Sequence, residues 1–281
     1  MANKVWNKLG PGANSFFMKT ITGIGILMAA VFLNGCATMN GERVLAEKTE
    51  SGPIAVSDSG TPVLVELFTS EGCSSCPPAD RVLLTIARDA GVSKAKVITL
   101  GFHVDYWNYL GWKDRFSTAE FTRRQEAYAR QFKLDSSYTP QMVVDGSSQF
   151  VGSNRANAID AISKNASQSK AAVDLVLADD KLLANVSGLP AHSDATVYLA
   201  VAESKLFSKV GGGENSGSTL EHASVVRVLI PIGKVSTTEN GIRAEHAIST
   251  NREWKSENVK FVVFVQENST LKVLAVNEIG Q

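Results

Sequence analysis

The sequence predicts an α/β domain, a mixed four-stranded sheet flanked by helices, followed by an all-β sandwich domain. Strand-like apolar runs alternate with helical patterns up to about residue 165. From about Ala171, short β-type runs follow one another without a convincing helix. The junction between the two patterns, 166–172, is rich in Ser, Gln and Lys. We therefore place the α/β domain at 62–168 and the sandwich at 171–281.

The N-terminal pattern has the order strand, helix, strand, helix, strand, strand, helix. A helical crossover makes the first two strands parallel, and the tight Gly146-Ser147 turn makes the last two antiparallel. Proline suits the first turn of a helix, and a capping box at Ser117–Glu120 begins another helix. The expected strands are 62–69, 97–102, 141–145 and 149–151, and the expected helices follow Cys76, Phe116 and Asn154.

The C-terminal pattern consists of short apolar runs separated by polar turns, which is typical of an antiparallel sandwich. We find no internal repeat in it. Its expected strands lie at about 173–177, 183–186, 196–201, 224–232, 242–248, 261–265 and 271–276.

Composition excludes several classes of protein. The length of 281 residues suits two domains, and 44% apolar with 20% charged residues excludes a disordered or fibrous chain. Lys plus Arg and Asp plus Glu both number 28, so no basic excess points to nucleic acid. A count of 3 cysteines excludes a disulfide-dense secreted scaffold.

The N-terminal segment has the features of an export signal. Lys19 precedes the uncharged run Ile21–Leu33, which is shorter than the ~20 apolar residues of a membrane span and fits a secretory signal. The run ends in Leu33-Asn34-Gly35-Cys36, which resembles the lipobox of bacterial lipoproteins. We expect a signal peptide at 1–36, lipidation of Cys36, a flexible tether at 37–61 and a periplasmic, membrane-anchored protein. An ordinary cleaved signal is the alternative.

The strongest chemical signal is Cys73-Ser-Ser-Cys76, between a buried strand and the start of a helix. Two cysteines at this spacing on a first helical turn can close a disulfide, and the free N–H groups of the helix start favour a thiolate. We expect the helix start to leave Cys73 exposed and Cys76 behind it, so that Cys73 is the attacking thiol and Cys76 the resolving thiol. The alternative is a structural disulfide. The motif also fits half of a zinc site, but the chain has no second CxxC.

Residues 62–165, with Cys73 and Cys76 as the active-site pair, resemble the thioredoxin fold. Tyr138-Thr139-Pro140 matches the cis-proline loop that faces the cysteines in that fold and docks extended substrate. We expect the third strand to lie beside the first, which brings Thr139 and Pro140 to the cysteine pair. The inner Ser-Ser dipeptide differs from that of thioredoxins and leaves the direction of electron transfer open.

Nearly all of the chain after the export segment is similar to a bacterial family of exported thioredoxin-like proteins, domain of unknown function 1223. This resemblance implies a fold and thiol chemistry, but no substrate. The motifs that carry it are Glu66-Leu-Phe-Thr-Ser-Glu-Gly-Cys-Ser-Ser-Cys76, His103-Val-Asp-Tyr-Trp107, Gly111-Trp112-Lys-Asp114, Thr122-Arg-Arg-Gln125, Gly213-Glu-Asn215 and Val225-Val226-Arg227.

Further site candidates lie on the first two strands and just after them. Thioredoxins hold a buried acid shortly before the first cysteine, and Glu66 stands near that place. A buried carboxylate there can exchange a proton with the resolving thiol, and a place on a polar rim is the alternative. His103 follows the second strand, with Asp105 and Trp107 close behind it, which favours a substrate groove. Packing in an aromatic cluster is the alternative.

Two other features lie outside these candidates. Arg123 and Arg124 stand beside Gln125 on a capped helix, and we expect them on its solvent face. Gly211–Thr219 fits neither a phosphate loop nor a nucleophile elbow. It is either a flexible loop between strands or a lid that reaches the thiols through Glu214, Asn215 or His222.

The favoured function is thiol–disulfide exchange on envelope proteins, with Cys73, Cys76, Pro140 and Glu66 as catalytic residues. The chemistry needs no organic cofactor, and electrons come from an unidentified redox partner. One alternative is a lipoprotein that binds or delivers copper or zinc through the same cysteines and His103. Another is a non-enzymatic envelope adaptor whose disulfide is structural.

Overall fold

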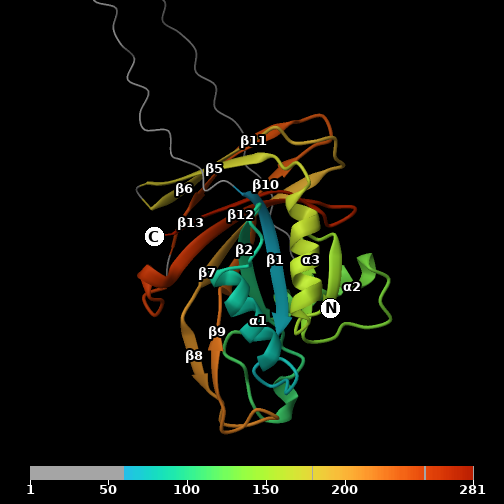
Figure 1. Ribbon diagram of the computed structural model, residues 1–281. Helices are drawn as coiled ribbons and strands as arrows, with labels where there is room; N and C mark the ends of the chain where they lie inside the picture. The colour runs from blue at the N-terminus through green and yellow to red at the C-terminus, as the bar shows by residue number, and fades with distance from the viewer. Residues whose placement is uncertain (1–59, 179, 250, 281) are drawn as a thin grey trace, which may run out of the picture. The chain divides into compact units, whose positions relative to one another are not determined.

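The computed structural model describes residues 60–178, 180–249 and 251–280 (Figure 1). The predicted signal peptide at 1–36, with the lipidation site Cys36, and the tether up to residue 59 lie outside the described residues. In the described part of the chain, none of the helices has both the length and the apolar character needed to cross a membrane.

An eight-stranded mixed sheet joins strands from both halves of the sequence (Figure 1). The neighbours β1 and β2 are parallel and the pair β3–β4 is antiparallel, as predicted, and β3 lies beside β1. In order across the sheet the strands are β13 (Val273–Gly280), β12 (Val259–Glu267), β7 (Ala195–Glu203), β10 (Val225–Val235), β2 (Ala95–His103), β1 (Thr61–Thr69), β3 (Gln141–Val144) and β4 (Ser148–Val151).

The predicted fold class, a four-stranded thioredoxin-like domain followed by a separate β-sandwich, is wrong because one sheet spans both segments. β10 lies parallel to β2, with Val225 opposite Gly101, and Gly101 N donates to Ser224 O at 2.8 Å. Only glycine fits easily at 101, since a Cβ there would lie 3.0 Å from Ala223 O. Local periodicity predicts strands, but it does not predict which distant strand completes an open edge.

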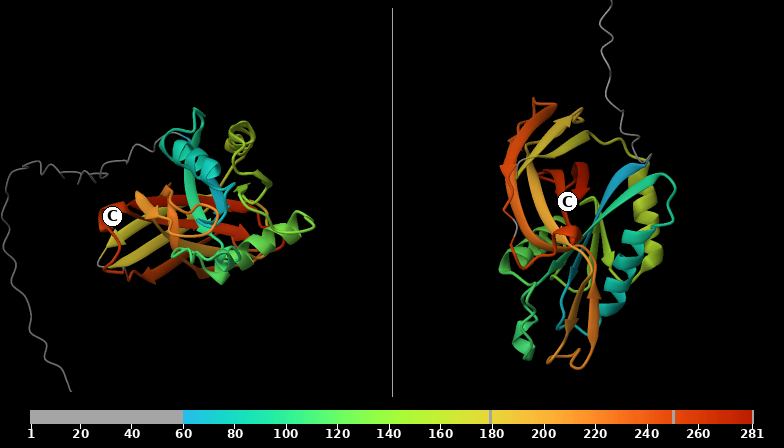
Figure 2. Two further views of the ribbon diagram at one scale, coloured as in Figure 1. Left: turned by 90° about the horizontal axis from the view of Figure 1, so that it is seen from below. Right: turned by 90° about the vertical axis from the view of Figure 1, so that its left-hand side faces the viewer.

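The described helices cover the strands of the N-terminal half. α1 (Pro77–Arg88) and α3 (Arg155–Ala166) pack on one face of β1 and β3 (Figure 2). α2 (Ala119–Gln131) packs on the opposite face through Phe121 and Tyr128. This two-sided covering explains why β1 is buried along most of its length, as expected for a strand that reads as a continuous apolar run. The helix cap of α2 is Thr118, within the predicted capping box.

A three-stranded antiparallel sheet packs on the C-terminal strands of the large sheet (Figures 1 and 2). Leu182 and Val186 of this small sheet share a buried cluster with Leu199 and Phe261 of the large one. This packing explains the sandwich-like periodicity of the C-terminal sequence, because each strand there buries one face between two sheets. The strands, in order, are β11 (Gly241–Ala247), β6 (Lys181–Ser187) and β5 (Ala172–Ala178).

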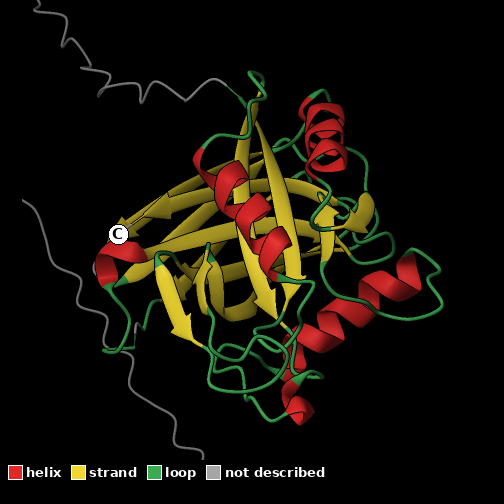
Figure 3. Cartoon of the chain, turned by 60° about the horizontal axis from the view of Figure 1, so that its bottom comes forward, coloured by secondary structure: helices red, strands yellow, loops and turns green. Residues whose placement is uncertain are grey.

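A short hairpin, β8 (Leu206–Lys209) and β9 (Thr219–His222), leads directly into β10. Because β10 pairs with β2, this connection brings residues 210–222 to the end of the sheet where β1 and β2 finish. Strands dominate the described chain, with helices at its surface (Figure 3). Short 3-10 helices complete the elements at η1 (Asn108–Leu110) and η2 (Ser256–Asn258).

Candidate functional site

Cys73 and Cys76 lie between β1 and α1 and are joined by a disulfide. Cys76 is the helix N-cap residue, and its carbonyl accepts a hydrogen bond from Ala79 N at 2.8 Å. Both cysteines are 0% exposed, whereas Ser74 and Ser75 between them are exposed. The predicted pair is therefore formed, but the expectation that Cys73 is exposed is wrong. In this state a bulky substrate cannot reach either sulfur.

The segment before β3 reaches the disulfide, as the strand order predicts. The Thr139–Pro140 bond is cis, which agrees with the expectation from the sequence. Thr139 Oγ1 donates to Cys73 Sγ at 3.3 Å and accepts from Trp107 Nε1 at 2.7 Å. Because the Trp107 N–H occupies an acceptor position, the hydroxyl hydrogen of Thr139 is left to point at the sulfur. Trp107 thus orients a hydrogen-bond donor that favours a thiolate at Cys73.

The loop between β8 and β9 covers the disulfide. Glu214 Oε2 accepts from Ser74 N at 2.9 Å, and Asn215 Nδ2 donates to the carbonyls of Glu71 and Cys73 at 2.8 and 2.9 Å. Hydrogen bonding by Ser74 lowers the pKa of the Glu214 carboxyl. These contacts fit the lid interpretation of this segment, because two of the three residues named for it, Glu214 and Asn215, bind the backbone of the cysteine loop. The third, His222, lies 3.3 Å from Glu71 instead.

A cluster of buried acids and histidines lies beside the covered disulfide. His103 Nδ1 and Asp114 Oδ2 are 2.6 Å apart, and His222 Nε2 lies 3.3 Å from Glu71 Oε1. The two imidazole rings meet edge to face, with centroids 4.9 Å apart. We call this set the acid–histidine cluster; it consists of Glu71, Asp80, His103, Asp114 and His222, all less than 9% exposed.

The surroundings move the pKa values of this cluster in different directions. Burial alone would lower the pKa of His103, but the nearby carboxyl groups, Asp114 foremost, together raise it. Burial opposes ionisation of Asp114, yet His103 and two backbone N–H groups lower its pKa. For Asp80 burial dominates and raises the pKa, although both histidines act against it. The cluster therefore holds a charged pair next to an acid that retains its proton more strongly than usual.

Asp80 connects the cluster to the helix that begins at Cys76. It lies four residues after Cys76 in the first turn of α1, and residues at this spacing share a helix face. Asp80 also lines a cavity of about 170 Å³ between α1 and β9. Asp80 is thus placed one helical turn from Cys76 and next to a space that can admit water.

The Glu66 side chain contacts α2 and not the cysteines. Its carboxylate accepts from Arg124 Nε at 2.7 Å and from the Tyr128 hydroxyl at 2.5 Å, both on α2. The expectation that Arg124 faces solvent is wrong, since its side chain is 10% exposed and lies over the rings of Phe102 and Phe264. The polar partners and this packing make Glu66 part of the contact between α2 and the sheet, and no contact joins its side chain to the disulfide.

Asp105 and His103 have separate partners. Asp105 Oδ1 accepts from Thr122 Oγ1 at 2.6 Å, which links the loop after β2 to α2, whereas His103 pairs with Asp114.

We did not predict the roles of Glu71, Asp80 and Asp114. Glu71 and Asp114 stand within the motifs that carry the family resemblance, which is the signal that could have identified them. In the described residues, no group of three or more His, Cys, Asp or Glu side chains could hold a metal ion.

Fold and site together define a mostly β protein with a buried CxxC disulfide at a helix start. The chain belongs to the family described as protein of unknown function (DUF1223), whose model matches residues 64–266. No curated protein matches the sequence.

Among solved structures, the crystal structure of protein AGR_C_4864 from Agrobacterium tumefaciens is similar, with a TM-score of 0.62 and 26% identity. The match covers 77% of this chain and 92% of that chain. A domain of the outer membrane lipoprotein Omp28 from Porphyromonas gingivalis gives a TM-score of 0.26 at 18% identity, over 40% of this chain and 88% of that one. The latter similarity is too low to support an argument.

Proposed function

We propose that this protein carries out thiol–disulfide exchange on envelope proteins through Cys73 and Cys76. The observation that carries the proposal is the disulfide at the start of α1, which has a hydroxyl donor on one sulfur and an acid–histidine cluster beside it. A helix start and a nearby hydroxyl both favour a thiolate, which is the species that reacts with disulfides.

The exchange runs through one mixed disulfide. The Cys73 thiolate attacks a substrate disulfide, the substrate S–S bond breaks, and Cys73 is bonded to one substrate sulfur. The Cys76 thiolate then attacks Cys73 Sγ, which releases the second substrate thiolate and leaves the Cys73–Cys76 disulfide. Two electrons pass to the substrate, and a dithiol redox partner restores the protein by the reverse steps. Thr139 and Pro140 shape the groove in which the substrate chain docks.

Asp80 is proposed to exchange the proton of Cys76. The resolving cysteine must lose a proton before it attacks and regain one when the disulfide opens, yet it is fully buried. Asp80 lies one helical turn along α1, its pKa is raised by burial, and it borders a cavity. An acid with these properties can both accept and return a proton.

The loop Gly211–Thr219 is proposed to open before exchange. Both sulfurs are buried beneath contacts of Glu214 and Asn215, so a protein substrate needs this loop displaced. The complete burial of the disulfide also favours a second candidate function, a non-enzymatic envelope adaptor with a structural disulfide. The two candidates differ in whether Cys73 ever bonds to another protein.

The proposed place of action is the periplasm. The uncharged run 21–33 and the segment Leu33–Cys36 support export and a lipid anchor. If Cys36 carries the anchor, Cys36→Ala should move the protein from the membrane fraction to the soluble fraction or leave it unprocessed. Fractionation of cells that express each form measures this, and membrane association unchanged by the substitution contradicts the anchor.

Replacing the resolving cysteine tests the exchange itself. In cells, Cys76→Ser should accumulate mixed disulfides between Cys73 and envelope proteins, because the trapped bond cannot be resolved. Non-reducing electrophoresis followed by mass spectrometry identifies them, and Cys73→Ser/Cys76→Ser is the matched control. Absence of adducts, together with a wild-type reduction potential below about −300 mV, would instead support the structural disulfide.

Asp80→Asn separates a role in proton transfer from a role in stability. The pKa of Asp80 is raised in the folded state, so the contribution of this group to stability is fully present below the ordinary value of 3.8. That contribution is lost as pH rises through the shifted pKa. The variant should therefore unfold at higher denaturant concentration at pH 7, yet exchange at least ~10-fold more slowly with a model disulfide. The control is Asp160→Asn on the exposed side of α3. A variant that is less stable, or that exchanges at the wild-type rate, rules out this role.

Glu214→Ala tests the lid through access of a small phosphine reductant to the disulfide. The variant should be reduced at least ~3-fold faster at pH 7, because the charged acceptor for Ser74 N is lost. The pKa of Glu214 is lowered, so its contribution is present above the ordinary value of 4.5 and is lost as pH falls. The variant-to-wild-type rate ratio should thus approach one in acid.

The matched control for this comparison is Glu239→Ala. Glu239 is an equally exposed glutamate that accepts from Ser236 N at 2.8 Å, outside the site. Equal reduction rates of Glu214→Ala, Glu239→Ala and wild type at pH 7 would show that the loop does not limit access.

A further inference from the structure

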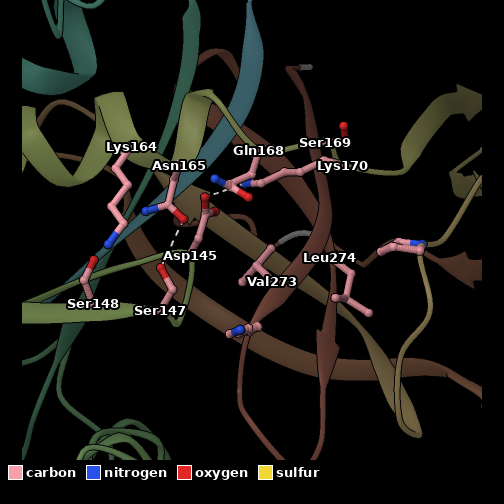
Figure 4. A pocket seen from close by; sticks show the side chains of 12 residues that line it. Asp145, Ser147, Ser148, Lys164, Asn165, Gln168, Ser169, Lys170, Val273 and Leu274 are labelled. Carbon is pink, nitrogen blue, oxygen red and sulfur yellow. Dashed lines mark hydrogen bonds and ion pairs between the residues drawn. The ribbon is translucent and has the colours of Figure 1, made fainter.

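A cavity of about 430 Å³ lies at the end of α3, apart from the cysteines (Figure 4). Its walls come from the β3–β4 turn, the end of α3, the connection from α3 to β5 and the start of β13. This volume falls within the range of small-molecule sites. None of the residues of the candidate redox site is among those that line it.

The cavity wall is basic. Among the described residues that line it are three lysines, Lys164, Lys170 and Lys272, and one acid, Asp145, which gives a formal charge of 3 − 1 = +2. Lys170 Nζ lies 2.5 Å from Asp145 Oδ2, and Figure 4 shows the lysine extended toward this acid. Lys164 and Lys272 are exposed at the rim. A concave surface lined by one sign of charge attracts ligands of the other sign.

Two buried donors face this cavity without a full set of partners. The Lys170 side chain is 5% exposed, and no other described residue accepts from its ammonium group, which has three N–H donors. Ser148 Oγ is also buried and has no partner in the described chain. Burial lowers the pKa of Lys170 and raises that of Asp145. The attraction between the two groups therefore offsets only part of the cost of burying their charges. Because buried polar groups are normally hydrogen-bonded, we expect a bound ligand to supply an acceptor for these donors.

Val273, Leu274 and Pro190 supply an apolar part of the wall. A ligand that suits the whole cavity has an anionic acceptor group and a short apolar body. We propose that this cavity binds a small organic carboxylate, whose oxygens meet Lys170, Ser148 and the rim lysines and whose apolar body lies against Val273 and Leu274. This site is independent of thiol chemistry at the disulfide.

Calorimetric titration of the full chain with benzoate, succinate and inorganic phosphate tests the proposal. Benzoate or succinate should bind saturably with a Kd below ~1 mM, and phosphate at least ~10-fold more weakly, because phosphate has no apolar body. The double variant Lys164→Gln/Lys272→Gln should weaken carboxylate binding at least ~10-fold. These rim lysines are exposed, so the variant is expected to fold.

The matched control is Lys209→Gln/Lys255→Gln, which removes the same charge from exposed positions outside the cavity. Equal loss of binding in both double variants would indicate attraction by net charge alone and overturn the site. Failure of both carboxylates to bind, or phosphate binding as tightly as they do, would overturn it as well. Because none of these measurements involves the cysteines, the result is separate from the outcome of the trapping experiment.

Discussion

The pairing of β10 with β2 is the contact on which the rest of the structure depends. This pairing is short: Val225 lies opposite Gly101, and Gly101 N donates a hydrogen bond to Ser224 O. Through it the N-terminal strands and the C-terminal strands share one sheet. A side chain at 101 would crowd the carbonyl of Ala223, so a single glycine permits the approach of two segments more than 120 residues apart.

This pairing also builds the candidate site. His222 ends β9 just before β10, and the loop with Glu214 and Asn215 precedes β9, so these residues arrive at the cysteines as a consequence of the sheet order. Glu71 lies just after β1, and His103 is the last residue of β2. The acid–histidine cluster is therefore shared by both halves of the chain, and neither half contains it alone.

The two sets of buried charges have different characters. Glu66 and Arg124 form an ion pair whose hydrogen bonds and aromatic neighbours satisfy both partners, which is the condition for a buried pair that supports packing. In the acid–histidine cluster, burial raises the pKa of Asp80, and this residue also lines a cavity. Groups kept in such an unfavourable state are typical of functional sites, where stability is given up for reactivity.

The sequence by itself determined the local structure and the chemistry of the pair. The cis bond before Pro140 and the family follow from resemblances carried by motifs along the chain. The strands and helices of the N-terminal half and the CxxC at a helix start follow from signals within a few residues. These signals suffice because caps, prolines and hydrophobic periods act over one or two turns of chain.

Only the tertiary structure decided which distant groups meet. It joined β10 to β2, paired His103 with Asp114 instead of leaving it beside Asp105, and covered the disulfide with the loop that carries Glu214. It also withdrew Arg124 from solvent to neutralise Glu66. The physical reason is that an edge strand or a buried charge can be satisfied by any complementary partner, and the global packing of the sheet selects one.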